Sequence, residues 1–293
     1  MLAQISLSVA SCLGVVPSEP AATPAVPVVI RVATFNLEDV RSSDLADGSN
    51  PRLKRLAEVI QRIRPNVILL NEIAFDPETA TPAADGTGGA SAGGGKPGGS
   101  NGQRFAELYL AVAQAPDVAP LRMRAFMAPV NTGLFSGFDL DNDGTVTSTY
   151  PTPRPSGPDG SPAPLPPAEQ AAARAYGGDC WGFGTFPGQY GMALLVDERL
   201  TIDLKDVRTF QMFPWSFLEG AITPKNPDGT EFYSTEEFEQ FRLSSKSHWD
   251  VPVILPNGAK VHFLCSHPTP PAFDGPEQRN KRRNHDEIRF WRD

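Results

Sequence analysis

RPNVILLNE at residues 64–72, preceded by VIRVATFN at residues 29–36, decides the fold of this chain. The earlier segment is rich in β-branched residues and ends in a polar turn, as strands do. The later segment contains a short, nearly continuous apolar run, which is expected of a strand covered on both faces. A polar residue stands at the end of each segment, Asn36 in the first and Glu72 in the second.

The residues between these two strands predict a helix. Asn50 and Pro51 supply an N-cap and a proline in the first helical turn, and Pro65 stops the run. Apolar residues recur between them at helical spacing, at Leu53, Leu56, Ile60 and Ile63. Strand, helix and strand in this order predict a βαβ unit, whose parallel strands bring their C-terminal ends to one edge of the sheet. Asn36 and Glu72 are therefore expected to lie near each other.

Further elements follow along the chain and are interrupted by two insertions. The sequence predicts helices at residues 104–113 and 284–292, and strands at residues 122–128, 192–196, 206–213, 251–255 and 260–267. Residues 84–102 form a Gly-rich low-complexity segment, and residues 151–167 are Pro-rich. Both segments are predicted to be flexible insertions within one α/β domain, residues 29–293, rather than linkers between two domains.

Composition limits the classes of function. Of the 293 residues, 40% are hydrophobic and 20% are charged, which supports a sizeable core in a single domain. The formal net charge is -8, so the chain has no broad basic field to hold nucleic acid non-specifically. A duplex-wrapping role is therefore disfavoured, whereas a nuclease is not excluded, because a bound divalent metal supplies local positive charge.

The first 28 residues predict export. Residues 2–16 are apolar and small and lead into a Pro/Ala-rich spacer, as a leader and tether do, although no Lys or Arg precedes them. VASC at residues 9–12 resembles a bacterial lipobox, which makes Cys12 a candidate lipid anchor. We expect a secreted, periplasmic or cell-surface protein, with a merely disordered N-terminus as the alternative. No run of about 18 apolar residues occurs, so no transmembrane helix is predicted.

Glu72 is the sharpest chemical feature. A carboxylate at the end of an otherwise apolar strand is costly unless it is paired, hydrogen-bonded or bound to a metal. As a hard oxygen ligand it suits Mg²⁺, Mn²⁺ or Ca²⁺. From this segment alone, a strand-end Glu that reaches solvent or a Lys is an equal alternative.

TFN at residues 34–36, the amphipathic helix and RPNVILLNE together resemble the opening of the endonuclease/exonuclease/phosphatase superfamily, which includes deoxyribonuclease I. The resemblance implies a four-layer α/β sandwich, in which two mixed sheets pack face to face with helices outside. It implies that Asn36 helps to organise the metal and phosphate site, and that Glu72 is the principal ligand of a catalytic Mg²⁺ or Mn²⁺. Glu38 stands where some members place a second acidic ligand.

VHFLCSHPTPP at residues 261–271 extends the resemblance. Alternation along the predicted strand sends His267 to the same face as Val261, Phe263 and Cys265. In the family a His at this strand end contacts the phosphate or leaving group, which makes His267 a candidate catalytic residue. A lone His is more often structural, and that alternative stays open. Among the other histidines, the pattern predicts ordinary roles for His262 and His285 and does not decide the role of His248.

Cations precede the strand at residues 251–255. FRLSSKSHWDVPV carries Arg242, Ser245 and Lys246, in a segment where the family often has Ser, Lys or Arg near substrate. Arg242 and Lys246 are therefore candidate phosphate contacts. Solvated loop charges are the equal alternative.

GFDLDNDGT at residues 137–145 is a separate signal. Asp139, Asp141 and Asp143, followed by Gly144, reproduce the first half of an EF-hand-like calcium loop. Tyr150 occupies the twelfth position, where such a loop has its closing acidic residue. A structural Ca²⁺ site and an Asp-rich turn are both compatible with this pattern.

The remaining two cysteines leave two alternatives. Cys180 and Cys265 either pair in an oxidising compartment or stay buried free thiols. Spacing does not choose between a disulfide and thiols.

The resemblance also has departures. The family completes its site with an Asp-x-Asn pair and a terminal Ser-Asp-His, and neither occurs in this sequence. Met192 stands where many members carry a polar residue. We therefore expect the sandwich to be incomplete at its C-terminal end, and this chain by itself to be inactive or nearly so.

These patterns predict metal-dependent hydrolysis of phosphate esters by a monomer, with a phosphodiester or a phosphomonoester as substrate. Acidic charge and export favour scavenging of phosphate esters or extracellular nucleic acid. The alternative from another class is a non-catalytic, calcium-stabilised extracellular binding module.

Overall fold

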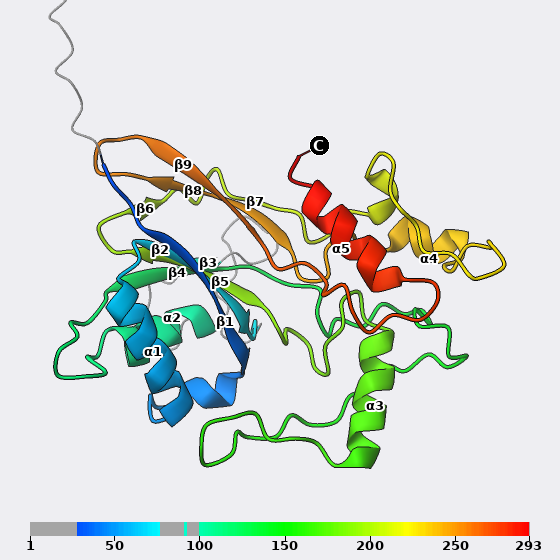
Figure 1. Cartoon of the computed structure of the whole chain (residues 1–293), viewed down its shortest axis with the longest axis horizontal. Helices are drawn as coiled ribbons and strands as arrows, with labels where there is room; N and C mark the ends of the chain where they lie inside the picture. Colours follow the sequence, from blue (N-terminus) through cyan, green and yellow to red (C-terminus); the bar gives the residue numbers. More distant parts are fainter. Residues whose placement is uncertain (1–27, 77–90, 93–99, 293) are drawn as a thin grey trace, which may run out of the picture.

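A computed structural model describes residues 28–76, 91–92 and 100–292 (Figure 1). The leader with Cys12 and most of the insertion at residues 84–102 lie outside the described residues. Within the described part, each helix is too short or too polar to span a bilayer.

The first sheet is mixed and has the strand order β1-β2-β5-β4-β3. Its strands are β1 (Val32–Val40), β2 (Val67–Ile73), β3 (Ser91–Ala92), β4 (Met123–Met127) and β5 (Met192–Asp197). β1 runs parallel to β2. The other neighbours are antiparallel: β2 pairs with β5, β5 with β4, and β4 with β3. The strands predicted near residues 122–128 and 192–196 are confirmed.

The predicted βαβ unit is confirmed. Helix α1 (Pro51–Ile63) joins the parallel strands β1 and β2. The Asn50 side chain accepts hydrogen bonds from the backbone N–H groups of Arg52 and Leu53, and Arg64 ends the helix in the left-handed conformation. This unit brings the C-terminal ends of β1 and β2 together.

The second sheet is antiparallel and is built on β8 (His248–Ile254). β9 (Lys260–Ser266) pairs with β8, as do the short strands β6 (Thr201–Ile202) and β7 (Arg208–Thr209). The predicted strand at residues 206–213 is wrong in extent, because a turn closed by the Phe213 N–H and the Phe210 carbonyl follows β7. β8 also begins three residues before the predicted position, residue 251, at His248.

The other described helices are α2 (Asn101–Phe105), η2 (Ala106–Leu110), α3 (Pro167–Gly178), α4 (Thr235–Gln240), α5 (Arg279–Arg289), η1 (Ser42–Leu45) and η3 (Trp215–Phe217). The helix predicted at residues 104–113 begins earlier, because the Ser100 side chain caps α2. The helix predicted at residues 284–292 also begins earlier, since the Asp274 carboxylate accepts from the first backbone N–H groups of α5.

The helices are distributed unevenly around the sheets (Figure 1). α1 and α2 cover the face of the first sheet that points away from the second sheet, whereas α3, α4 and α5 gather at one side, beyond the ends of the strands. The α/β fold with two sheets is therefore present, and the four-layer sandwich and its incompleteness stay predictions.

One hydrophobic core lies between the two sheets. Trp249 of β8 is fully buried and meets Phe126 of β4 edge-on, with ring centroids 5.3 Å apart. A second cluster lies among the turns next to α4 and α5 and is formed by Leu140, Trp181, Trp215, Leu218, Tyr233, Phe241 and Leu243. Cys180 and Cys265 are buried free thiols, so the disulfide alternative is wrong.

Candidate metal and phosphate site

A bulge at the end of β1 shapes the site. The parallel register pairs Asn36 with Asn71 and resumes with Val40 paired to Ile73. Between these pairs the chain advances four residues along β1 but only two along β2. Such a bulge turns the side chains of the longer strand in a new direction, as bulges beside active sites do.

Four non-glycine residues at this edge have left-handed backbones. The φ angles are 57° at Glu38, 55° at Asp39, 62° at Glu72 and 56° at Tyr190. This conformation costs an L-residue roughly 1–2 kcal/mol. Strain of this kind persists only where surrounding structure imposes it, and it clusters at functional sites.

Glu72 is oriented by Asn36. The Asn36 Nδ2 donates to Glu72 Oε1 over 2.8 Å, and the backbone N–H of Glu38 donates to Asn36 Oδ1 over 2.8 Å, which fixes the amide. The Glu38 carboxylate itself is exposed. Among the described residues, no hydrogen bond reaches Glu72 Oε2. The carboxylate thus offers one oxygen to a ligand from outside.

His267 reaches the same carboxylate. Its Nε2 lies 3.5 Å from Glu72 Oε1, and the two side chains are 21% and 24% exposed. The contact with His267, followed by that with Asn36, lowers the pKa of Glu72 against the opposing effect of burial. Glu72 is therefore ionised at neutral pH. Asn36 and His267 therefore both contact the same oxygen, Oε1 of Glu72. These three are the candidate catalytic residues.

Lys246 lies next to this group and is buried. Only 6% of the residue is exposed, so the alternative of a solvated loop charge is wrong for Lys246. Burial lowers its pKa to about 8, against the opposing charges of Glu287 and Glu72. Among the described residues its ammonium has no hydrogen-bond partner. A buried cation without a direct partner is costly, and an anionic ligand would relieve that cost.

Tyr190 belongs to the site and was missed by sequence reasoning. The Ile73 N–H donates to the Gly191 carbonyl over 3.2 Å, which sets Tyr190 alongside Glu72. Burial, followed by the charges of Asp39 and Glu72, raises the pKa of Tyr190 to about 12, so its hydroxyl stays protonated. The available signal was the position of Tyr190 just before the apolar run of β5, but only the antiparallel register places that position where β2 ends.

The family model of the Endonuclease/Exonuclease/phosphatase family matches residues 33–293. The chain belongs to this family. Comparisons with curated proteins and with solved structures gave no match.

Endonuclease/exonuclease/phosphatase proteins usually use a divalent metal such as Mg²⁺, and the donor set here fits one. Glu72 presents an ionised carboxylate with an oxygen that no described residue hydrogen-bonds. Carboxylate oxygen is the ligand type that Mg²⁺ and Mn²⁺ prefer. We find no contact between the carboxylates of Glu72 and Glu38 among the described residues, so the role of Glu38 as a second ligand stays a prediction.

Glu287 of α5 holds two segments of the site in place, and sequence reasoning also missed it. The residue is fully buried, and its carboxylate accepts from the backbone N–H groups of Ser245 and Thr269. Ser245 precedes Lys246, and Thr269 follows His267 by two residues, so one carboxylate holds both segments. The signal was a pair of acids inside the Arg-rich run RNKRRNHDEIR, since buried carboxylates need partners.

Arg242 is held elsewhere. It donates to Asn131 Oδ1 over 2.7 Å and lies over the Trp181 ring, 5.1 Å from its centroid. Burial lowers the pKa of this guanidinium. We find no contact to Glu72 among the described residues, and a phosphate contact by Arg242 stays a prediction.

The remaining histidines have structural partners. His248, whose role the sequence left open, is buried between the Ser244 hydroxyl and the Glu287 carbonyl. His262 pairs with Asp250 and His285 pairs with Asp286, which agrees with the ordinary roles predicted for them.

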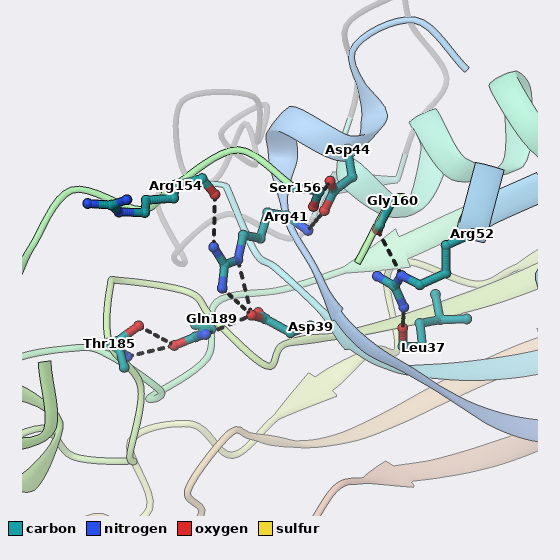
Figure 2. Close-up of polar contacts among 10 residues, drawn as sticks. All are labelled: Leu37, Asp39, Arg41, Asp44, Arg52, Arg154, Ser156, Gly160, Thr185 and Gln189. Carbon is teal, nitrogen blue, oxygen red and sulfur yellow. Dashed lines mark hydrogen bonds and ion pairs between the residues drawn. The ribbon is translucent and has the colours of Figure 1, made fainter. Parts of the chain in front are cut away.

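Asp39 and Arg41 form an ion pair at the bulge, in addition to the contact between Glu72 and His267 (Figure 2). Arg41 Nη2 lies 2.6 Å from Asp39 Oδ2, and both side chains are almost buried. Gln189 Nε2 donates to Asp39 Oδ1 over 3.1 Å, and Arg41 Nη1 donates to the Arg154 carbonyl over 2.9 Å. The end of β1 thereby joins the Pro-rich insertion to the loop before β5.

The three carboxylates of the calcium-like loop converge. Oxygens of Asp139, Asp141 and Asp143 all lie within 4.8 Å of one another. Burial and the charge of Asp143 raise the pKa of Asp141, which indicates that the neighbouring carboxylates repel one another. The arrangement would suit a cation, and calcium itself stays a prediction.

We predict that Ca²⁺ raises the melting temperature of the chain, because binding to the folded state alone stabilises it. At a concentration of roughly 100 times the Kd the gain is about 2.7 kcal/mol. Asp141→Asn should remove the gain, whereas Asp228→Asn, in an exposed turn, should keep it. Thermal denaturation with and without EDTA is the measurement, and an equal response from both variants would contradict the site.

Proposed function

We propose that this protein takes part in the metal-dependent hydrolysis of phosphate esters, with Glu72 at the centre of its site. The observation that carries the proposal is the juxtaposition at Glu72. An ionised carboxylate, with Asn36 and His267 on one oxygen, lies near a buried ammonium that has no direct partner. A metal on the carboxylate and a phosphate near the ammonium would complement both charges.

Glu72 would hold the metal, Mg²⁺ or Mn²⁺. When bound, such a cation polarises the phosphoryl oxygen and stabilises the leaving oxyanion. Asn36 keeps the carboxylate in place through its hydrogen bond to Oε1. The chain therefore supplies a fixed anionic ligand that needs no rearrangement before the metal binds.

Three side chains would bind the ester group itself. Lys246 attracts the phosphate, and desolvation makes its charge more effective than that of an exposed lysine. His267 would donate a hydrogen bond from Nε2 to a phosphate oxygen in place of its contact with Glu72, and the protonated Tyr190 hydroxyl would donate another. The three donors share the charge that builds up on the phosphate oxygens during attack by water.

The proton acceptor for the attacking water is not among these residues. Export, a monomeric state and extracellular phosphate esters or nucleic acid as substrates remain part of the proposal, on the sequence patterns given above.

The test is hydrolysis of p-nitrophenyl phosphate, bis(p-nitrophenyl) phosphate and plasmid DNA. The full product of the gene is assayed in Mg²⁺, Mn²⁺, Ca²⁺ or EDTA. Turnover by the full product that EDTA abolishes would support the proposal and rank diesters against monoesters. A folded full product with no turnover in any metal would overturn it in favour of the calcium-stabilised binding module, which the converging Asp139, Asp141 and Asp143 favour.

Phosphate binding should depend on pH through Lys246. The pKa of Lys246 is lowered to about 8. The side chain is therefore positively charged below that pH and loses its charge as the pH rises through the pKa. Affinity for inorganic phosphate, measured by isothermal titration without metal, should fall roughly ten-fold by one unit above the pKa. Lys246→Arg keeps its charge over this range and should give a flat profile. A wild-type profile that is equally flat would remove Lys246 from the phosphate site.

A further inference from the structure

A cavity of about 300 Å³ lies beside the candidate site. It is an open pocket bordered by the end of β1, the Pro-rich insertion, α3 and the loop before β5. Ligand pockets begin at about this volume. The cavity is large enough for one small organic group and too small for a nucleic-acid duplex.

Tyr190 connects the cavity to Glu72. It lines the cavity, and the hydrogen bond from the Ile73 N–H to the Gly191 carbonyl sets it alongside Glu72. A phosphate ester held at Glu72 would therefore have the cavity within reach of its organic part. Asp39, on the strained bulge, lines the cavity as well.

Part of the cavity lining is apolar. It consists of Pro162, Ala163, Pro164 and Leu165 from the insertion, with Ala173 from α3. Proline rings and short aliphatic side chains offer flat surfaces for a ring to lie against. Because this part carries no formal charge, it favours an uncharged group.

The rest of the lining is polar and carries a net positive charge, because Arg174 adds to the Asp39–Arg41 pair. Asp39 and Arg41 neutralise each other, and Thr185 and Gln189 add a hydroxyl and an amide (Figure 2). The Thr185 N–H and hydroxyl both bond to Gln189 Oε1, which fixes these side chains. This part of the lining therefore offers hydrogen-bonding groups and one further cation to a ligand.

The insertion is anchored at several points, so the apolar part of the lining is formed in advance of any ligand (Figure 2). Arg41 binds the Arg154 carbonyl, Ser156 binds Asp44, and Arg52 Nε donates to the Gly160 carbonyl over 3.0 Å. A Cβ at Gly160 would lie 2.1 Å from the Asn50 side chain, so only glycine allows this approach. The flexibility predicted for residues 151–167 stays a prediction, and any movement would break these contacts.

We propose that this cavity is the subsite for the organic part of the phosphate ester. It would take a compact ring that bears hydrogen-bonding groups, as a nucleoside does, against the Pro-rich residues of the lining. The inference rests on the proposed function for its phosphate, but the cavity has its own test. It implies a preference for single nucleotides or strand ends over the interior of a duplex.

The experiment is equilibrium binding to the 293-residue chain in Mg²⁺, with inorganic phosphate, thymidine and thymidine 5′-phosphate as probes. Ala163→Trp is designed to fill the cavity, and Ala163→Leu to fill it in part. Ala168→Trp makes the same change at an exposed residue outside the lining and is the matched control. A thermal denaturation midpoint close to that of the wild type shows that each variant is folded, whether or not phosphate binds.

Thymidine 5′-phosphate should bind at least ten-fold more tightly than inorganic phosphate. Ala163→Trp should abolish this gain, Ala163→Leu should reduce it, and Ala168→Trp should keep it. Equal affinities for the two phosphates, or a gain that survives Ala163→Trp, would overturn the subsite. A third outcome is that thymidine binds, inorganic phosphate does not, and Ala163→Trp abolishes thymidine binding. This outcome would support the subsite and contradict the proposed function.

Discussion

Glu72→Gln should reduce the metal-dependent turnover of the full product of the gene by roughly 1000-fold, which corresponds to about 4 kcal/mol of lost transition-state stabilisation. The substitution removes the charge that holds the metal but keeps the size of the side chain and an acceptor for Asn36 Nδ2. Because it leaves packing unchanged, the loss should appear in turnover and in Mg²⁺ affinity rather than in folding. Steady-state kinetics and isothermal titration with Mg²⁺ measure the two quantities.

Glu198→Gln is the matched control for this result. Glu198 is exposed and follows β5, at the end of that strand remote from Tyr190. The same chemical change there should leave turnover and Mg²⁺ affinity unaltered. If Glu72→Gln retained wild-type Mg²⁺ affinity, Glu72 would not be the metal ligand, whatever the turnover.

Glu287→Ala should lower the free energy of unfolding by about 3 kcal/mol or more, as removal of one partner from a buried charged group does. The change leaves the backbone N–H groups of Ser245 and Thr269 buried without their acceptor. It also removes the negative charge that opposes the lowered pKa of Lys246. Urea denaturation followed by tryptophan fluorescence measures the loss.

Glu239→Ala provides the comparison, because Glu239 is exposed on α4. Surface substitutions of this kind usually change stability by less than about 0.5 kcal/mol. Glu287→Ala should also weaken phosphate binding, since both Lys246 and His267 lie next to the segments that Glu287 holds. Equal stability of the two variants would show that Glu287 is not the support described here.

The fold near β1 and β2 was predictable because each step had a local cause. Asn50 and Pro51 mark the start of α1, Pro65 marks its end, and the parallel arrangement then places Asn36 beside Glu72. His267 was predictable from the end of its strand. These inferences depend on residues close together in the sequence, where capping and alternation are strong rules.

The rest of the site depends on contacts between distant segments. The segment around Lys246 has no periodicity, and its burial follows from α5, whose Glu287 is far along the chain. The placement of Tyr190 follows from the antiparallel register of β5, which the apolar run alone does not reveal. The short extent of β7 reflects a turn that its β-rich residues did not indicate.

The left-handed residues of the site matter for attempts to stabilise this protein by mutation. Glycine adopts the backbone angles of Glu38, Asp39 and Tyr190 without the penalty that an L side chain has there. A laboratory selection for heat resistance alone would therefore reward glycine at Glu38, whose side chain is exposed, by up to roughly 1 kcal/mol, whereas Asp39 and Tyr190 are kept by their buried contacts. Such a variant would gain thermal tolerance but lose the carboxylate of Glu38 beside Glu72, so a stabilisation experiment should keep Glu38 unchanged.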